Sequence, residues 1–145
     1  MFKKITEIFG ASDDVRSRGV GLTHSVPLIS TRDFALLEWM ASTELDAMSA
    51  APVLAVLERS RVVPPDQLGP DTIRIGSRVT IDADSGPPFE VRLVPPDQPR
   101  NLGDLAVTSA LGLALLGRQE GDVVIARLPG RDAAATVMIH AVHAP

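Results

Sequence analysis

Two pairs of side chains have the chemistry of metal ligands or of an acid–base pair. Asp82 and Asp84 are two residues apart, and His140 and His143 are three apart. Both pairs fall in segments where apolar and polar residues alternate, which predicts strands. Residues three apart in a strand point to opposite faces, so these histidines cannot chelate one metal ion. A solvated turn accounts for the aspartates as well as an acid–base role does. We therefore expect no catalytic residue, no metal and no cofactor.

Composition excludes several other classes of protein. The 145 residues include no cysteine, which removes disulfides, thiolate metal sites and cysteine nucleophiles. The formal net charge of −4 disfavours binding to a nucleic-acid backbone. No apolar run approaches the ~18 residues of a membrane span, and the first residues lack the apolar core of a signal peptide. We expect a cytoplasmic protein with no membrane and no direct sequence-specific nucleic-acid partner. No feature defines an oligomeric state.

The chain divides into three parts. Residues 1–26 have a short amphipathic stretch followed by a Gly/Ser-rich, charged stretch, which predicts a flexible N-terminal segment. Residues 27–70 have two runs with helical periodicity, which predicts a short helical hairpin. Residues 71–145 alternate apolar and polar positions around one helical run, which predicts a sheet with a covering helix. The fold class is therefore α+β.

Start and stop signals define the hairpin. Ser30 followed three residues later by Asp33 is typical of a helix start, with Asp in place of the usual Glu. A second helix is expected to begin after Ser49, with Pro52 in its first turn. The sequence Val-Pro-Pro at 63–65 ends it. Two helices of about twelve residues joined by a short link make an αα-hairpin.

The third part is predicted to have the order β-β-β-α-β-β. Its first strand, at 73–81, contains a bend at Gly76. Ser109 is expected to cap the helix, and Gly117 to end it in a left-handed conformation. The remaining elements are expected at 89–93, 105–107, 110–116, 123–128 and 136–142.

The segment 109–130, SALGLALLGRQEGDVVIARLPG, is the most informative part of the chain. Together with the strand sequence IGSRVTI at 75–81, it resembles the C-terminal domain of the bacterial Gre transcript-cleavage factors. The resemblance covers residues 71–143 and departs from the usual pattern at Ala110, where the family has proline. It implies an FKBP-like antiparallel sheet with one helix.

The resemblance also implies a partner and a docking surface. The Gre C-terminal domain docks on bacterial RNA polymerase at the rim of the secondary channel. By resemblance, Ser109, Leu111 and Gly112 occupy the helix start that lies near the docking face. Arg118 and Asp122 are expected to be exposed candidates for polymerase contact, although a solvated loop explains these two equally well.

The length of the hairpin distinguishes between two families that the chain resembles. Gre factors carry a long antiparallel coiled coil whose acidic tip holds Mg²⁺ in the polymerase active site. The short hairpin predicted here is more similar to the Rnk family, the regulators of nucleoside diphosphate kinase, which bind RNA polymerase and compete with Gre factors without stimulating cleavage. Glu44 and Asp46 are expected at the hairpin tip, in the place of the Gre acidic residues.

Three alternatives stay open on the sequence. An active Gre-type cofactor would use Glu44 and Asp46 to help the polymerase cleave RNA. A prolyl isomerase would need an aromatic-lined pocket, whereas Phe89 is the only aromatic residue of the third part. An interaction module for another partner, such as a kinase, is the third. The sequence favours a non-enzymatic regulator that binds RNA polymerase.

Overall fold

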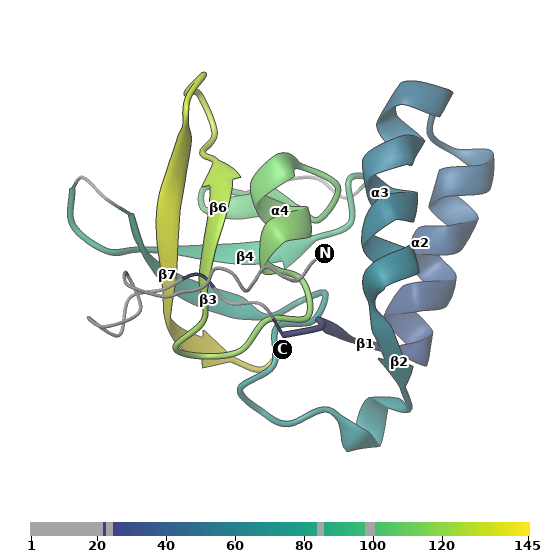
Figure 1. Ribbon diagram of the computed structural model, residues 1–145, viewed down its shortest axis with the longest axis horizontal. Helices are drawn as coiled ribbons and strands as arrows, with labels where there is room; N and C mark the ends of the chain where they lie inside the picture. The colour runs from purple at the N-terminus through teal and green to yellow at the C-terminus, as the bar shows by residue number, and fades with distance from the viewer. Residues whose placement is uncertain (1–21, 23–24, 84–85, 98–100) are drawn as a thin grey trace, which may run out of the picture.

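The computed structural model describes residue 22 and residues 25–83, 86–97 and 101–145. The N-terminal segment expected at 1–26 lies outside the described residues, except for residues 22, 25 and 26. The rest of the chain forms a helical hairpin that stands beside a sheet (Figure 1). No helix in the described part of the chain has the length and apolar character needed to cross a membrane.

The hairpin consists of α2 (Thr31–Thr43) and α3 (Ala47–Arg59). The Ser30 side chain caps α2 by accepting a hydrogen bond from the Asp33 backbone N–H, as the sequence predicts. The helix α3 begins at Ala47, so the expected start after Ser49 is wrong. Asp46 is the reason, because its side chain accepts a hydrogen bond from the Ser49 N–H and caps the helix earlier. Pro52 consequently lies inside α3.

Two short strands close the open end of the hairpin. The strands β1 (Leu28–Ser30) and β2 (Arg61–Val63) pair in parallel, one directly before α2 and the other just after α3. A single 3₁₀ turn, η2 (Pro65–Gln67), follows. Three residues are too few for a visible alternation of apolar and polar positions, so the sequence does not predict these strands.

The second part of the chain forms a five-stranded sheet in the order β5-β4-β3-β7-β6. Its pairs are antiparallel, as expected, except that β5 runs parallel to β4. The strands are β3 (Arg78–Ala83), β4 (Phe89–Val94), β5 (Asp104–Ala106), β6 (Val123–Arg127) and β7 (Ala134–His143).

The first strand of the sheet begins later than the sequence predicts. Ser77 donates its N–H to the Arg74 carbonyl, and its hydroxyl accepts the Arg74 N–H, so residues 74–77 form a turn. Gly76, in the middle of this turn, has a φ of 99°. The backbone of Ile73 instead bonds to Gly117 and Arg118, after the helix of the second part.

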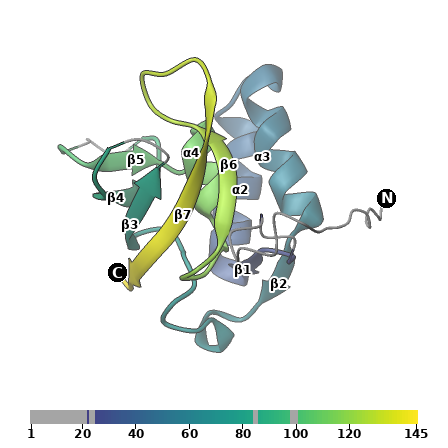
Figure 2. The same cartoon turned by 60° about the vertical axis from the view of Figure 1, so that its left-hand side comes forward.

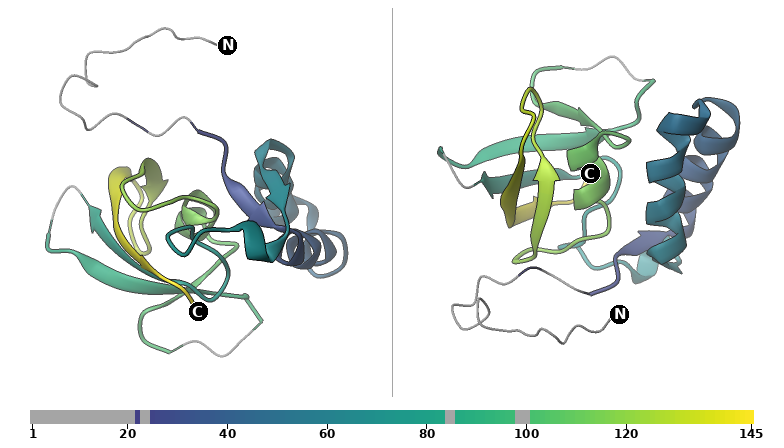
Figure 3. Two further views of the ribbon diagram at one scale, coloured as in Figure 1. Left: turned by 90° about the horizontal axis from the view of Figure 1, so that it is seen from below. Right: turned by 45° about the horizontal axis from the view of Figure 1, so that its top comes forward.

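One core joins the hairpin to the sheet. The helix α4 (Ala110–Leu115) contacts β6 on one side and α3 on the other. Figures 2 and 3 show it between the curled sheet and the hairpin. Its leucines are buried, as are the facing strand residues and the inner face of α2 and α3. The largest fully buried side chains are Ile29, Leu37, Val53, Ile73, Val79, Ile81, Leu93, Val107, Leu111, Leu115, Leu116 and Ile139.

Candidate functional site

The start of α4 is built by Ser109 and Gly112. The Ser109 hydroxyl donates to the Ala106 carbonyl at 2.7 Å and accepts the Gly112 N–H at 3.1 Å, so it ties β5 to the helix. A Cβ atom on Gly112 would lie 2.3 Å from the Ala106 carbonyl oxygen. Only glycine permits this approach of helix and strand. The first turn of α4 is therefore fixed against β5.

A cavity of about 340 Å³ lies beside this helix start. One wall is formed by Ser109, Ala110 and Leu111, and the other by the turn between β6 and β7, from Arg127 to Arg131. Leu111 is among the residues that line the cavity and is completely buried, and the neighbouring Gly112 is buried as well. These two residues therefore shape the surface beside the cavity from below it.

The structure places Arg118 and Asp122 at the other end of α4. Arg118 is half-buried, and its guanidinium donates to the Ser25 carbonyl. Burial lowers the pKa of Arg118 from its usual value, nearby Arg59 lowers it further, and Asp122 opposes both. The Asp122 carboxylate accepts the Gln119 N–H at 2.8 Å and closes the turn before β6. Both side chains were expected to be exposed, and both are instead engaged in holding a junction.

The carboxylates expected at the hairpin tip lie in the link between α2 and α3. Glu44 follows the last residue of α2 and is exposed. Asp46 caps α3 at 2.8 Å from the Ser49 nitrogen, and this hydrogen bond is the main reason that the pKa of Asp46 is lowered. One of the two carboxylates therefore has a structural role already. Among the described residues, no group of three or more His, Asp or Glu side chains gathers to hold a metal ion.

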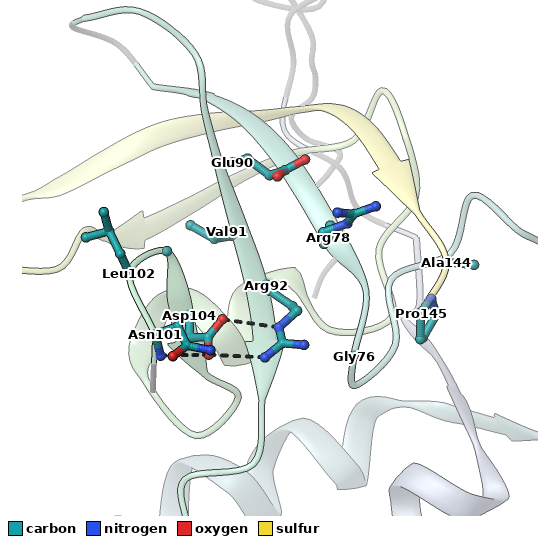
Figure 4. Close-up of a pocket in the computed structure, with 11 residues that line it drawn as sticks. Gly76, Arg78, Glu90, Val91, Arg92, Asn101, Leu102, Asp104, Ala144 and Pro145 are labelled. Atoms are coloured by element: carbon teal, nitrogen blue, oxygen red, sulfur yellow. Dashed lines mark hydrogen bonds and ion pairs between the residues drawn. The ribbon is translucent and has the colours of Figure 1, made fainter. Parts of the chain in front are cut away.

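A second cavity, of about 600 Å³, opens on the outer side of β3, β4 and β5 (Figure 4). The Arg92 guanidinium forms a paired contact with the Asp104 carboxylate there, with Nε and Nη2 at 3.1 and 3.2 Å from its two oxygens. The Asn101 N–H also donates to this carboxylate. Arg92 is the main cause of the lowered pKa of Asp104. Paired charges of this kind neutralise one another and offer no acid–base chemistry.

The predicted residues thus fall in three places. Ser109, Leu111 and Gly112 lie together at the start of α4, Arg118 and Asp122 at its end, and the two carboxylates at the hairpin link. Sequence reasoning missed Arg127 and the turn at 129–131, which face Ser109 across the cavity. The Pro-Gly pair in this turn marked a hairpin, but nothing in the sequence indicated that it would face α4.

Comparison with known proteins shows the family. The sequence profile of the family "Transcription elongation factor, GreA/GreB, C-term" matches residues 68–143, just over half of the chain. The chain therefore belongs to the GreA/GreB C-terminal family, a family of transcription elongation factors. The match includes the helix start, the cavity wall and the junction described above. It confirms the resemblance to the Gre factors, and the observed sheet with its covering helix agrees with it.

Individual relatives extend this result. The chain is 32% identical over 80 residues to transcription elongation factor GreA of Thermodesulfovibrio yellowstonii, covering 53% of this chain and 50% of that protein. The chain thus aligns with about half the length of this curated relative. The solved structure of a GreA/GreB elongation factor from Nitrosomonas europaea is 28% identical, with a TM-score of 0.67, and covers 83% of this chain and 99% of that one. That share is larger than the family segment, so the likeness reaches into the hairpin.

Proposed function

We propose that this protein is an RNA polymerase-binding regulator of transcription elongation that docks at the secondary channel and competes with Gre factors without promoting RNA cleavage. This is the behaviour of the Rnk-like proteins that its sequence resembles. The observation that carries the proposal is the short arm. Each hairpin helix has 13 residues, which at 1.5 Å per residue is about 20 Å.

The chemistry of the tip supports the same conclusion. A cleavage factor must bring free carboxylate oxygens to a divalent cation, because Mg²⁺ prefers oxygen ligands in near-octahedral geometry. Of the two carboxylates in the link, Asp46 already caps α3. Glu44 is then the one uncommitted carboxylate of this link. A short arm with a single free carboxylate fits occupation of the channel better than assistance to catalysis.

The arrangement of the surfaces supports docking through α4. The hairpin link and the turn between β6 and β7 lie at the same end of the molecule (Figures 1 and 2). A partner that contacts the cavity beside Ser109 can therefore meet the hairpin tip at the same time. We assign the docking surface to Ser109, Ala110, Arg127 and the turn at 129–131, with Leu111 and Gly112 as its support.

The test is a binding assay with bacterial core RNA polymerase, followed by competition with a Gre factor. We expect binding that the Gre factor displaces, and no RNA cleavage by stalled elongation complexes that contain this protein. Displacement together with stimulated cleavage would overturn the non-cleaving assignment and favour an active Gre-type factor. Absence of binding would overturn the proposal as a whole and favour another partner, such as a kinase.

A charge-reversal variant and its control locate the contact with the polymerase. Arg127→Glu reverses an exposed charge at the cavity and should weaken polymerase binding by about tenfold or more if this residue contacts the partner. Arg61→Glu makes the same charge change at an exposed position of β2 and should leave binding unchanged. Equal effects of the two variants would mean that overall charge governs binding.

The tip is tested in the cleavage assay. The double variant Glu44→Gln, Asp46→Asn removes both charges and keeps the cap of α3, because asparagine caps helices as well as aspartate does. The matched control is Glu38→Gln, Glu58→Gln, which removes two exposed carboxylates along the helices. Loss of cleavage stimulation in the tip variant alone would identify a Gre-type factor, whereas no stimulation by the wild type supports the proposal.

A further inference from the structure

A third cavity lies at the base of the hairpin, at the end of the molecule opposite to the hairpin link. It measures about 630 Å³ and separates the first turn of α2 from the turn at 74–76 and the end of β4. Arginines from these three places line it: Arg32, Arg74 and Arg92. Arg92 also lines the outer cavity, where Figure 4 shows it with Asp104. None of the proposed docking residues lines the cavity at the hairpin base.

Arg74 is held in place but not satisfied. Its Nη2 donates to the carbonyls of Leu68 and Gly69, at 3.3 and 3.0 Å. Its Nε is the one buried side-chain nitrogen or oxygen without a hydrogen-bond partner among the described residues. Buried polar atoms in folded proteins are nearly always paired with protein, water or a ligand. The Arg74 guanidinium is therefore fixed by backbone carbonyls and keeps one unused N–H donor.

The side chains that line the cavity also carry excess positive charge. Asp33 is the acidic residue among the lining side chains, and its Oδ2 accepts the Ile75 N–H at 3.0 Å. Arg92 is paired with Asp104, so Arg32 and Arg74 together outweigh Asp33 by one positive charge among the lining side chains. Arg32, which also lines the cavity, is exposed. Two arginines in a chain whose net charge is −4 favour an anion at this place.

The remaining lining is apolar. Leu36, Pro65, Ile75, Leu93 and Pro95 contribute to its walls. Small-molecule sites have volumes of about 300–1,000 Å³ and combine apolar walls with a few convergent polar groups. Arginine recognises phosphate oxygens through paired N–H donors. We propose that this cavity binds a phosphate-bearing small molecule, with its phosphate at Arg32 and Arg74 and its ring against Leu36, Pro65 and Pro95.

The test measures binding to the isolated chain, so it does not depend on RNA polymerase. Pyrophosphate and adenosine 5′-diphosphate are titrated by calorimetry at constant ionic strength. We expect saturable binding of both, with the nucleotide tighter because its ring contacts the apolar wall. Equal affinity of the two would overturn the placement of the ring, and absence of saturable binding would overturn the site.

Three variants assign the site to its arginines. Arg32→Gln and Arg74→Gln should each weaken pyrophosphate binding by about tenfold or more, because each removes charge-assisted hydrogen bonds to the phosphate. Arg32 is exposed, so its variant keeps the test valid if loss of the Arg74 contacts prevents folding. Arg127→Gln, on β6, should bind like the wild type. Equal weakening in all three variants would show a diffuse charge effect and overturn the proposal.

Discussion

The two hairpin helices each have an aspartate at their start, and the two aspartates have opposite pKa shifts. Asp33, at the base, is buried, and desolvation raises its pKa above the usual value. Asp46, at the tip, is exposed, and the Ser49 N–H lowers its pKa. Asp33 accepts the N–H of Ile75, 42 residues away, whereas Asp46 bonds only within its own helix turn. The turn before β3 therefore holds the base through a contact distant in sequence, whereas the tip is held by a local contact.

Backbone contacts strengthen this difference. The Leu28 N–H donates to the Gly117 carbonyl, the Gly117 N–H to Ile73, and the Arg61 N–H to Pro27. The first bond joins the start of the hairpin to the segment after α4, and the last joins the two ends of the hairpin to each other. The direction of the arm is therefore set at its base.

The strongest test of the base is Gly117→Ala. A Cβ atom here would lie 2.8 Å from the Pro27 Cβ and 2.9 Å from the Leu28 carbonyl oxygen, at a φ of 80°. Left-handed strain and overpacking together predict a loss of about 2–4 kcal/mol in the free energy of unfolding. Urea denaturation followed by circular dichroism measures this loss.

Gly121→Ala is the matched control for this substitution. Gly121 has a φ of 90°, but a Cβ atom there meets nothing within 4 Å. Only the backbone strain of about 1–2 kcal/mol is then expected. Equal losses in the two variants would mean that the contact between Gly117 and residues 27–28 does not hold the hairpin.

Asp33 provides the next largest effect. Asp33→Ala leaves the Ile75 N–H without its acceptor and should lower the free energy of unfolding by about 1–3 kcal/mol. Asp33→Asn keeps an acceptor oxygen and removes a buried charge, so at neutral pH it should be at least as stable as the wild type. A strongly destabilised asparagine variant would show that the charge itself, facing Arg32 and Arg74, stabilises the base.

The sign of the pH dependence follows from the raised pKa of Asp33. A raised pKa in the folded state means that folding favours the protonated acid. Its contribution is complete below the usual value of 3.8 and is lost as the pH rises through the folded pKa. The stability of the wild type relative to Asp33→Asn should therefore fall between acidic and neutral pH, as parallel denaturation series would measure. A rise would contradict the assignment.

Much of the fold could be predicted from the sequence because local signals carry it. Ser30 caps α2 and Ser109 caps α4, as expected. Gly117 has the expected left-handed backbone conformation after α4. The positions of β4, β6 and β7 agree with their alternating patterns to within a few residues. The late start of the first strand was missed, because the hydroxyl of Ser77 turns the backbone at a place where the apolar alternation continues.

The site was less predictable, since it depends on contacts between distant segments. Ser109 is recognisable as a cap, but its approach to the turn at 129–131 depends on the curl of the sheet. Arg118 follows a helix, in a segment whose composition is typical of an exposed loop. Its guanidinium nevertheless donates a hydrogen bond to the Ser25 carbonyl, 93 residues away. No local pattern records such a pairing. The sequence around Arg74 likewise does not indicate that its Nε is buried and unpaired.

Asp46 should respond to pH in the opposite direction from Asp33. Its lowered pKa means that its capping contribution is present above the usual value of 3.8 and is lost as the pH falls through the folded pKa. Asp46→Ala removes the acceptor for the Ser49 N–H, so the melting temperature should fall at neutral pH by less than in Asp33→Ala. The gap from the wild type should narrow in acid. A gap that widens in acid would contradict the capping role.

Glu44→Gln is expected to have the smallest effect. Glu44 is exposed, and its backbone N–H already bonds to the Met40 carbonyl, so the side chain is not needed to end α2. Surface substitutions of this kind change stability by about 0.5 kcal/mol or less. Denaturation should therefore match the wild type, while polymerase competition reports on the tip alone. A loss as large as that in Asp33→Ala would mean that the tip, too, is held by tertiary contacts, and the contrast between the two ends of the arm would no longer hold.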